Sequence, residues 1–184
     1  MTMEERLGEL KGKTLAFVGD THNNVSNSLM AMSAKMGVNF IACGPEHLKP
    51  ADEVIDACRP IAEANGCKIV ITSDMAELSQ ADVIYTDVWL SMGEAKEKWG
   101  ERIELLRPYQ VNAEMIAKCA PNVKFMHCLP ATRGEEVTDE VMDSDYSVCW
   151  DEAENRLTAM RALLVYFMGK MDETIAVCNK NLGR

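Results

Sequence analysis

The sequence predicts an α/β fold of the Rossmann-like, doubly wound type, with a mostly parallel sheet and helices on both faces. Short apolar runs alternate with segments of helical periodicity through most of the 184 residues. Such alternation implies strand–helix–strand crossovers, which join parallel strands. The length fits one domain, and a hydrophobic fraction of 47% is enough for a buried core.

The predicted strands are the apolar runs at residues 14–18, 39–43, 68–72, 82–86, 124–127 and 146–149. Helical segments fall between them. One helix is predicted over 24–36, where Gly37 stops it, and another over 51–64, which ends near Gly66. A short helix is expected around 75–78.

The last helix is predicted to begin at Asp151, because Asp151 and Glu154 stand close to the spacing of a capping box. Its apolar residues step by four and three, which predicts core packing for Ala153, Leu157, Met160, Leu164 and Phe167. Residues 89–108 lack clear periodicity. A long irregular segment inside a compact domain is more often a functional lid than a passive connector.

Charge and composition exclude several classes of protein. A formal net charge of −10 argues against nucleic acid or an anionic membrane as a partner. No apolar run approaches the roughly 20 residues that span a bilayer, and the polar, acidic start of the chain does not resemble a signal peptide. Seven scattered cysteines without a C-x-x-C pair indicate reduced thiols and a cytoplasmic protein. With three dispersed histidines, neither a metal site nor a cofactor is expected.

The first strand–helix junction, residues 19–24, has two possible readings. It lacks the G-x-G-x-x-G pattern, which disfavours a nicotinamide-dependent dehydrogenase domain. Either Asn23 or Asn24 simply caps the following helix, or an amide here lies in the ligand crevice. An amide both donates and accepts hydrogen bonds, which suits a zwitterionic amino acid.

Two ionisable side chains follow predicted strands. Asp87 and Cys128 stand where a parallel sheet opens its ligand crevice. Asp87 is either a turn former or a carboxylate that holds an amine and guides its proton loss. A Cys128–His127 nucleophile pair is disfavoured, because neighbours on a strand point to opposite faces. A cis bond between Leu129 and Pro130 would indicate a fixed turn.

Arg156 is a candidate anion ligand near the start of the last helix, where free N–H groups and the helix dipole also favour an anion. A lone arginine is otherwise most often a surface ion-pair partner. The acidic series that follows the cysteine motif is interpreted as a solvated face without chemistry; it comprises Glu135, Glu136, Asp139, Glu140, Asp143 and Asp145.

Four segments, in this order, resemble ornithine carbamoyltransferase over essentially the whole chain. They are residues 20–29, Asp87-Val88-Trp89-Leu90-Ser91-Met92-Gly93-Glu94, His127-Cys128-Leu129-Pro130, and Asp151-Glu152-Ala153-Glu154-Asn155-Arg156-Leu157. The resemblance implies that ornithine contacts come from Asn24, Asp87, Ser91 and Met92, with residues 91–93 in a loop that closes over it. It also implies that Cys128, Leu129 and Arg156 serve carbamoyl phosphate, and that the Leu129–Pro130 bond is cis.

The implied reaction is attack of the neutral δ-amine of ornithine on the carbamoyl carbon, giving citrulline and phosphate. The implied catalytic residues are Asp87, Cys128 and Arg156. An alkylamine has a pKa of about 10.4, so it is almost wholly protonated at neutral pH. A pocket that contains Asp87 and Cys128 can position the free amine and accept or relay its proton.

The resemblance covers only the second domain of that family. The Ser-Thr-Arg-Thr and His-Pro-x-Gln motifs of its carbamoyl-phosphate domain do not occur here. We therefore expect a remnant of the interdomain linker helix at 1–12, the ornithine-binding domain at 13–168, and a helical extension at 169–184 that packs on the absent domain. The chain looks like a fragment, a split-gene product or an isolated domain, inactive alone. The family's trimer contacts lie largely in the missing domain, so a monomer or weak association is expected.

Two alternatives stay open. Residues 132–138, Thr132 to Thr138, resemble the putrescine carbamoyltransferase branch, whereas Asn23-Asn24 and Ser91-Met92-Gly93 are of the ornithine type. A non-catalytic amino-acid-binding or regulatory module would have the same ligand residues. The direction of flux, arginine synthesis or arginine catabolism, is not encoded in these motifs.

Overall fold

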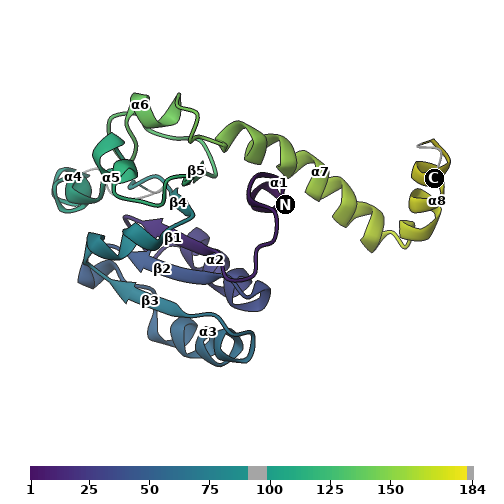
Figure 1. Ribbon diagram of the computed structural model, residues 1–184, viewed down its shortest axis with the longest axis horizontal. Coiled ribbons are helices and arrows are strands. Elements are labelled where there is room, and N and C mark those ends of the chain that lie inside the picture. Colours follow the sequence, from purple (N-terminus) through teal and green to yellow (C-terminus); the bar gives the residue numbers. More distant parts are fainter. Residues whose placement is uncertain (91–98, 182–184) are drawn as a thin grey trace.

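The computed structural model describes residues 1–90 and 99–181. A parallel sheet of five strands forms its centre, in the order β3-β2-β1-β4-β5 (Figure 1). The strands are β1 (Thr14–Val18), β2 (Asn39–Cys43), β3 (Ile69–Thr72), β4 (Val83–Thr86) and β5 (Lys124–His127). The chain builds outward from β1 to β3 and then returns to the other side of β1. This reversal creates a switch point between β1 and β4, where parallel α/β sheets bind ligands.

The helices of the body lie between and after these strands. The α-helices are α1 (Thr2–Leu7), α2 (Asn24–Met36), α3 (Asp52–Ala64), α4 (Trp99–Leu106), α5 (Ala113–Ala117) and α6 (Asp139–Met142). Short 3₁₀ helices are η1 (Glu46–Leu48), η2 (Met75–Gln80) and η4 (Arg107–Tyr109). Two helices end the described chain, α7 (Cys149–Phe167) and α8 (Met171–Asn181). Within the described residues, none of these helices has the length and apolar character needed to cross a membrane.

Each face of the sheet has its own apolar core, because successive residues of a strand point to opposite faces. Leu15 and Phe17 of β1 pack with residues of α2 and α3. Ala16 and Val18 pack with residues of η2, α5 and α6 on the opposite face. The predicted doubly wound α/β fold is therefore confirmed.

The start and end of α2 follow from local chemistry. The Asn23 side chain accepts a hydrogen bond from the Ser26 amide at 2.8 Å and so caps the helix. Gly37 ends it in the left-handed conformation, at φ 71°. The predicted bounds of this helix are confirmed.

The strand expected at 146–149 was wrong. Ser147 forms one isolated parallel bridge with Phe125, and α7 begins at Cys149. The predicted capping box was also wrong: Val148 occupies the N-cap position, and its side chain makes no cap hydrogen bond. Asp151 pairs instead with Arg6 of α1 at 2.6 Å, so the start of α7 is tied to the N-terminal helix.

The apolar stripe of the last helix does not pack in a core. Figure 1 shows α7 leaving the body, with α8 at its far end. Leu157, Leu164 and Phe167 are 55%, 60% and 79% exposed. The pattern predicted correctly that a helix forms, but the described chain provides no surface against which this face packs.

The segment 89–108 is not irregular throughout, because α4 and the start of η4 lie within it. The expected lid residues, including Ser91, Met92 and Gly93, lie outside the described residues. The helices α5 and α6 were not predicted. They have only five and four residues, too few to establish a helical period.

Candidate functional site

Three polar side chains meet where the strands β1, β4 and β5 end. The Cys128 thiol, just after β5, donates a hydrogen bond to Asp87 Oδ1 at 3.1 Å. Asp87 follows β4, and its Oδ2 accepts a longer hydrogen bond, 3.5 Å, from the Asn23 amide. Asp87 Oδ1 also accepts from the Val88 backbone N–H at 2.8 Å, which fixes the carboxylate. The sequence predicted Asp87 and Cys128 at this edge, and the structure brings them into direct contact.

The Cys128 thiol is held in its protonated form. Burial raises its pKa to about 12, and its hydrogen bond to Asp87 and the charges of Asp87 and Glu152 act in the same direction. A protonated thiol donates a hydrogen bond and is a poor nucleophile. At neutral pH, Cys128 therefore serves as a polar, neutral wall of the site.

The first strand–helix junction presents Asn23, rather than Asn24, to Asp87. Asn23 caps α2, which confirms the capping prediction, and its amide also reaches Asp87. A role for this amide in ligand binding remains a prediction. Asn24 is the first residue of α2 and is exposed. A role for Asn24 in ligand binding remains a prediction.

Two glycines allow β1 to turn sharply into this junction. Gly19 has φ 111°, and a Cβ on Gly44 would lie 2.1 Å from the Gly19 carbonyl oxygen. Asp20 then forms an ion pair with Arg102 of α4. The same guanidinium donates through Nε to the Trp89 carbonyl at 2.6 Å. Arg102 thereby ties the β1–α2 junction to the backbone that follows Asp87.

The turn after Cys128 rests on a buried pair that the sequence reading missed. His127 and Glu136 are both 0% exposed, and His127 Nε2 lies 3.2 Å from Glu136 Oε1. The Leu129 N–H donates to His127 Nδ1 at 2.9 Å, so Nε2 carries the proton and donates to Glu136. Glu136 also accepts from the Thr132 N–H. The interpretation of Glu136 as part of a solvated face was therefore wrong.

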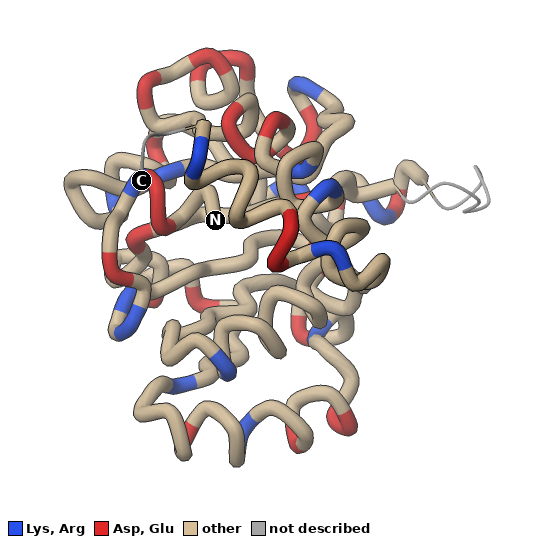
Figure 2. Tube along the Cα trace, turned by 90° about the vertical axis from the view of Figure 1, so that its right-hand side faces the viewer, with Lys and Arg blue, Asp and Glu red and all other residues tan. Residues whose placement is uncertain are grey.

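The Leu129–Pro130 peptide bond is cis, as the sequence resemblance implied. Leu129 itself has φ 56°, unusual for a residue with a side chain. Its amide is held by His127 Nδ1, so the buried pair supports the backbone directly after Cys128. The remaining acidic residues of the series do lie at the surface, where Arg133 pairs with Asp139 and Asp143 at 2.7 and 2.6 Å. Figure 2 shows this acidic group at the top of the molecule.

The expected lack of a metal-ligand cluster needs correction. One ligand atom from each of Asp87, His127 and Cys128 lies within 4.8 Å of the others. The sequence hides this group because the strands bring Asp87 together with residues 127 and 128 only after folding. Both His127 ring nitrogens already have hydrogen-bond partners, so metal binding here would require breaking one of those bonds.

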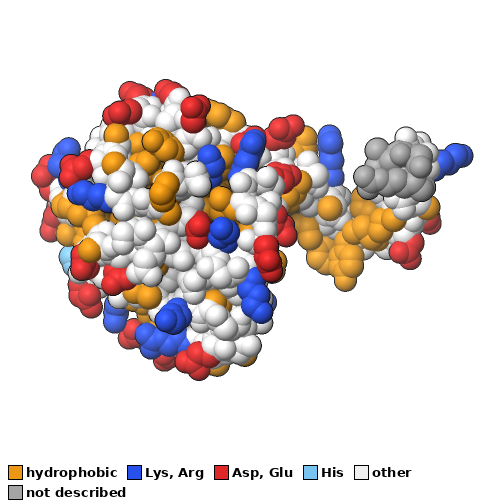
Figure 3. Space-filling model, in the orientation of Figure 1, with side chains coloured by type: hydrophobic (Ala, Val, Ile, Leu, Met, Phe, Trp, Pro, Cys, Tyr) orange, Lys and Arg blue, Asp and Glu red, His pale blue; other side chains and the backbone are white. Residues whose placement is uncertain are grey.

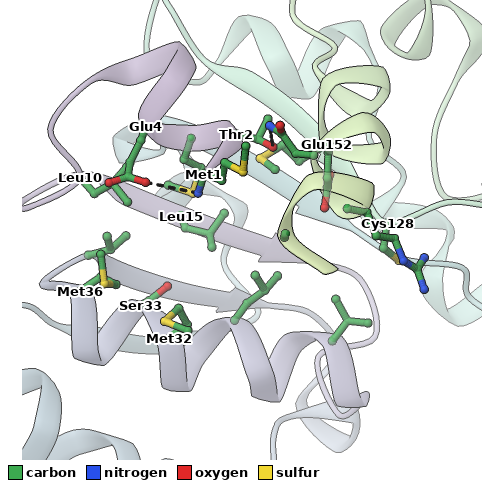
Figure 4. A pocket seen from close by; sticks show the side chains of 18 of the residues that line it. Met1, Thr2, Glu4, Leu10, Leu15, Met32, Ser33, Met36, Cys128 and Glu152 are labelled. Atoms are coloured by element: carbon green, nitrogen blue, oxygen red, sulfur yellow. Dashed lines mark hydrogen bonds and ion pairs between the residues drawn. The ribbon is translucent and has the colours of Figure 1, made fainter. Parts of the chain in front are cut away.

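An open cavity of about 690 Å³ lies between α1, α2 and α7 and reaches Cys128. Leu129 and Arg156 line it together with Cys128 and Glu152. The structure thus places the three residues predicted to serve carbamoyl phosphate around one space. Figure 4 shows side chains of its wall, among them the apolar Leu10, Leu15, Met32 and Met36 and the polar Thr2, Glu4 and Ser33.

This fold and these side chains define a class: a doubly wound α/β domain with a candidate ligand site at the carboxyl ends of its parallel strands. Residues 11–167 match the family model described as "Aspartate/ornithine carbamoyltransferase, Asp/Orn binding domain". The chain therefore belongs to the aspartate/ornithine carbamoyltransferase family and contains its Asp/Orn-binding domain.

Similar proteins agree with this assignment. The chain is 52% identical over 169 residues to ornithine carbamoyltransferase of Thermotoga petrophila, covering 90% of this chain and 53% of that protein. It is 43% identical to catabolic ornithine carbamoyltransferase of Bacillus licheniformis, covering 94% and 57%. The solved ornithine carbamoyltransferase from Pyrococcus furiosus superposes with a TM-score of 0.84 at 45% identity, over 89% of this chain and 52% of that one. The chain thus spans about half the length of these relatives.

Proposed function

We propose that this chain is the ornithine-binding half of a carbamoyltransferase that converts ornithine and carbamoyl phosphate into citrulline and phosphate. The observation that carries the proposal is the hydrogen-bonded Asp87–Cys128 pair at the carboxyl edge of the sheet. The names of the similar proteins support ornithine as the amine substrate.

Asp87 has the chemistry to receive the δ-ammonium group. Its carboxylate is half-buried, so its attraction for a cation is less screened than at the surface. One proton must leave the ammonium group before its nitrogen can attack. Asp87 is the proposed group that orients the amine and guides this proton loss. We also propose ornithine contacts from Asn24, Ser91 and Met92, of which the last two lie outside the described residues.

The proposed carbamoyl-phosphate side consists of Cys128, Leu129 and Arg156. Attack by the amine forms the nitrogen–carbon bond, and the carbon–oxygen bond to phosphate breaks. The proton that the attacking nitrogen then loses passes to the departing phosphate oxygen, so the product leaves as the dianion HPO4²⁻. Arg156 lies two turns into α7 and lines the cavity together with Cys128 and Leu129, so its positive charge favours an anion there. One arginine supplies only part of the positive charge that is needed to bind a phosphate dianion. We therefore propose that the remaining cationic groups come from the other half of the enzyme.

The proposed domain layout keeps a linker at 1–12, the ornithine domain at 13–168 and an extension at 169–184. The exposed apolar face of α7 supports this layout, because such a face is suited to a partner domain. We propose that this surface meets the carbamoyl-phosphate domain, that the whole enzyme is a homotrimer, and that this chain alone is monomeric or weakly associated. The seven free cysteines favour a cytoplasmic location.

Citrulline formation tests the proposed activity. The chain alone should produce no citrulline above background, whereas adding the carbamoyl-phosphate half of a similar enzyme should restore turnover. In that mixture, Asp87→Asn should lower turnover at least about a hundredfold, the scale of a lost proton-handling group. Asp56→Asn, at an exposed position of α3, is the matched control. Substantial turnover by the chain alone would contradict the proposed division of the site.

Putrescine is the second candidate substrate, on the basis of residues 132–138. In the structure, the Arg133 side chain of this segment is engaged with Asp139 and Asp143 at the surface. Thr132 contributes its backbone to the buried Glu136. Neither described contact reaches Asp87, so the segment gives no direct support for a putrescine site. A non-catalytic amino-acid-binding module would bind ornithine but give no citrulline in the mixed assay.

A further inference from the structure

Polar contacts join the first two turns of α7 to α1, and the proposed reaction assigns them no role. The Asn155 amide donates to the Thr2 hydroxyl at 2.9 Å (Figure 4) and to Glu5 Oε2 at 2.6 Å. Asp151, one turn earlier in α7, forms an ion pair with Arg6 at 2.6 Å. Thr2 is 5% exposed, whereas Glu5 is exposed. Asn155 therefore has one buried and one exposed partner in the same helix.

The residues that make these contacts are spaced by one helical turn. Asp151 and Asn155 are four positions apart in α7, and residues at this spacing lie on one face of a helix. Their partners Thr2, Glu5 and Arg6 are three and four positions apart in α1, so they also share a face. Turning α7 about its own axis would break the contacts of both residues at once.

Helix α1 is itself fixed to the body of the domain. Its Met3 and Leu7, with Leu10 just after it, pack against the apolar core on the side of the sheet that α2 and α3 cover. The other attachment of α7 is the hydrogen bond from Tyr85 of β4 to Glu152, at 2.6 Å. The start of α7 is thus held from two sides, by α1 and by the sheet.

The neighbouring face of α7 contributes to the wall of the cavity. Glu152 and Arg156 each follow directly after one of the residues that contact α1, and one residue turns a helix by about 100°. Both line the cavity that reaches Cys128. The rotation of α7 that brings Asn155 onto α1 is therefore also the rotation that brings Arg156 to the cavity.

We propose that Asn155 is a positioning residue for carbamoyl phosphate: it holds α7 against Thr2 and Glu5 and so sets the place of Arg156 in the cavity. This role rests on the proposed function, in which Arg156 serves carbamoyl phosphate. An arginine side chain loses rotamer freedom when it binds a ligand. A helix held at one rotation keeps the guanidinium near the anion beforehand, which reduces the free-energy cost of binding. Asn155 acts through Arg156 and needs no contact with the substrate.

Hydrogen exchange of the α7 backbone amides tests this contact in the chain alone. Asn155→Val removes both hydrogen bonds, and valine has nearly the helix propensity of asparagine. The amides of residues 153–158 should then exchange at least about fivefold faster, on the scale of one lost hydrogen bond. The matched control is Thr158→Val, at an exposed position one turn later, which should leave exchange unchanged. Equal exchange in the unsubstituted chain and in Asn155→Val would overturn the proposal.

A reversed hydrogen bond separates the loss of the contact from any effect of the shape of valine. Asn155→Asp places a second carboxylate against Glu5, and the two repel each other. Adding Glu5→Gln restores one donor and one acceptor, and the Thr2 hydroxyl can donate to the new carboxylate. We expect fast exchange in the single variant and near-normal exchange in the double variant. Fast exchange in both would contradict the role of the Asn155–Glu5 contact.

Kinetics of the mixture with the carbamoyl-phosphate half test the consequence for the substrate. Asn155→Val should raise the KM for carbamoyl phosphate at least about fivefold and leave the KM for ornithine unchanged. An unchanged KM for carbamoyl phosphate, or an equal rise in both values, would overturn the inference. If the mixture without substitutions formed no citrulline, the proposed function would fail. Exchange in the chain alone would then still decide whether Asn155 holds α7 in place.

Discussion

The helices α2 and α7 both carry apolar residues at helical spacing, but they have different surroundings. In α2, Met30 and Ala34 are fully buried against the sheet. In α7, Leu164 and Phe167 are 60% and 79% exposed. Figure 3 shows hydrophobic side chains gathered on α7 where it projects from the body. Apolar residues at helical spacing therefore predict a helix, but they do not show whether its apolar face is buried within the described chain.

Connectivity explains the difference. Helix α2 is held at both ends, because β1 leads into it and Gly37 turns the chain into β2. Up to residue 181, α7 is followed by α8 and by no strand. Its attachments lie in its first two turns, where Glu152 bonds to Tyr85, Asp151 to Arg6, and Asn155 to Thr2 at 2.9 Å.

The largest expected difference in the free energy of unfolding is between the alanine variants of two phenylalanines. Phe17 in β1 is fully buried and stacks with Tyr85, their ring centroids 5.8 Å apart. Phe17→Ala should lower the free energy of unfolding by about 3–5 kcal/mol. Phe167→Ala, in α7, should change it by less than about 0.5 kcal/mol, because the side chain is already exposed to water. Urea denaturation of the isolated chain measures both. Similar losses in the two variants would mean that α7 packs on a core in solution.

A smaller difference in stability is expected between the alanine variants of the two asparagines at the start of α2. Asn23→Ala removes the helix cap and should cost about 1 kcal/mol of stability. Asn24→Ala, one residue later, should cost little, because this side chain is exposed. Thermal unfolding of the two variants provides the comparison. A larger loss for Asn24→Ala would show that the helix starts differently from the structure described here.

The sequence alone predicted the bounds of those helices and strands whose ends are set by local sequence signals. The bounds of β1, α2, β2 and β5 match the predicted ranges, because each combines an apolar run with a clear boundary signal such as Gly37. Asp87 and Cys128 were also placed correctly, since the ends of parallel strands meet at one edge.

The remaining features depend on tertiary contacts that the sequence does not display. Glu136 looks like its acidic neighbours, but its burial follows from His127, which lies nine residues earlier. Asn23 and Asn24 are adjacent amides, and only the geometry of the helix start distinguishes them. The exposure of the α7 apolar face is likewise not visible in the sequence, because its periodicity is the same as that of a helix packed on a core.

Titration calorimetry of the chain tests the central claim most directly. Ornithine and putrescine are titrated separately, first without and then with carbamoyl phosphate. The account predicts that ornithine binds, even at millimolar strength, and that putrescine gives no heat. Putrescine binding as tightly as ornithine would contradict the substrate assignment. No binding of either would contradict the claim that this half of the enzyme forms the amino-acid site by itself.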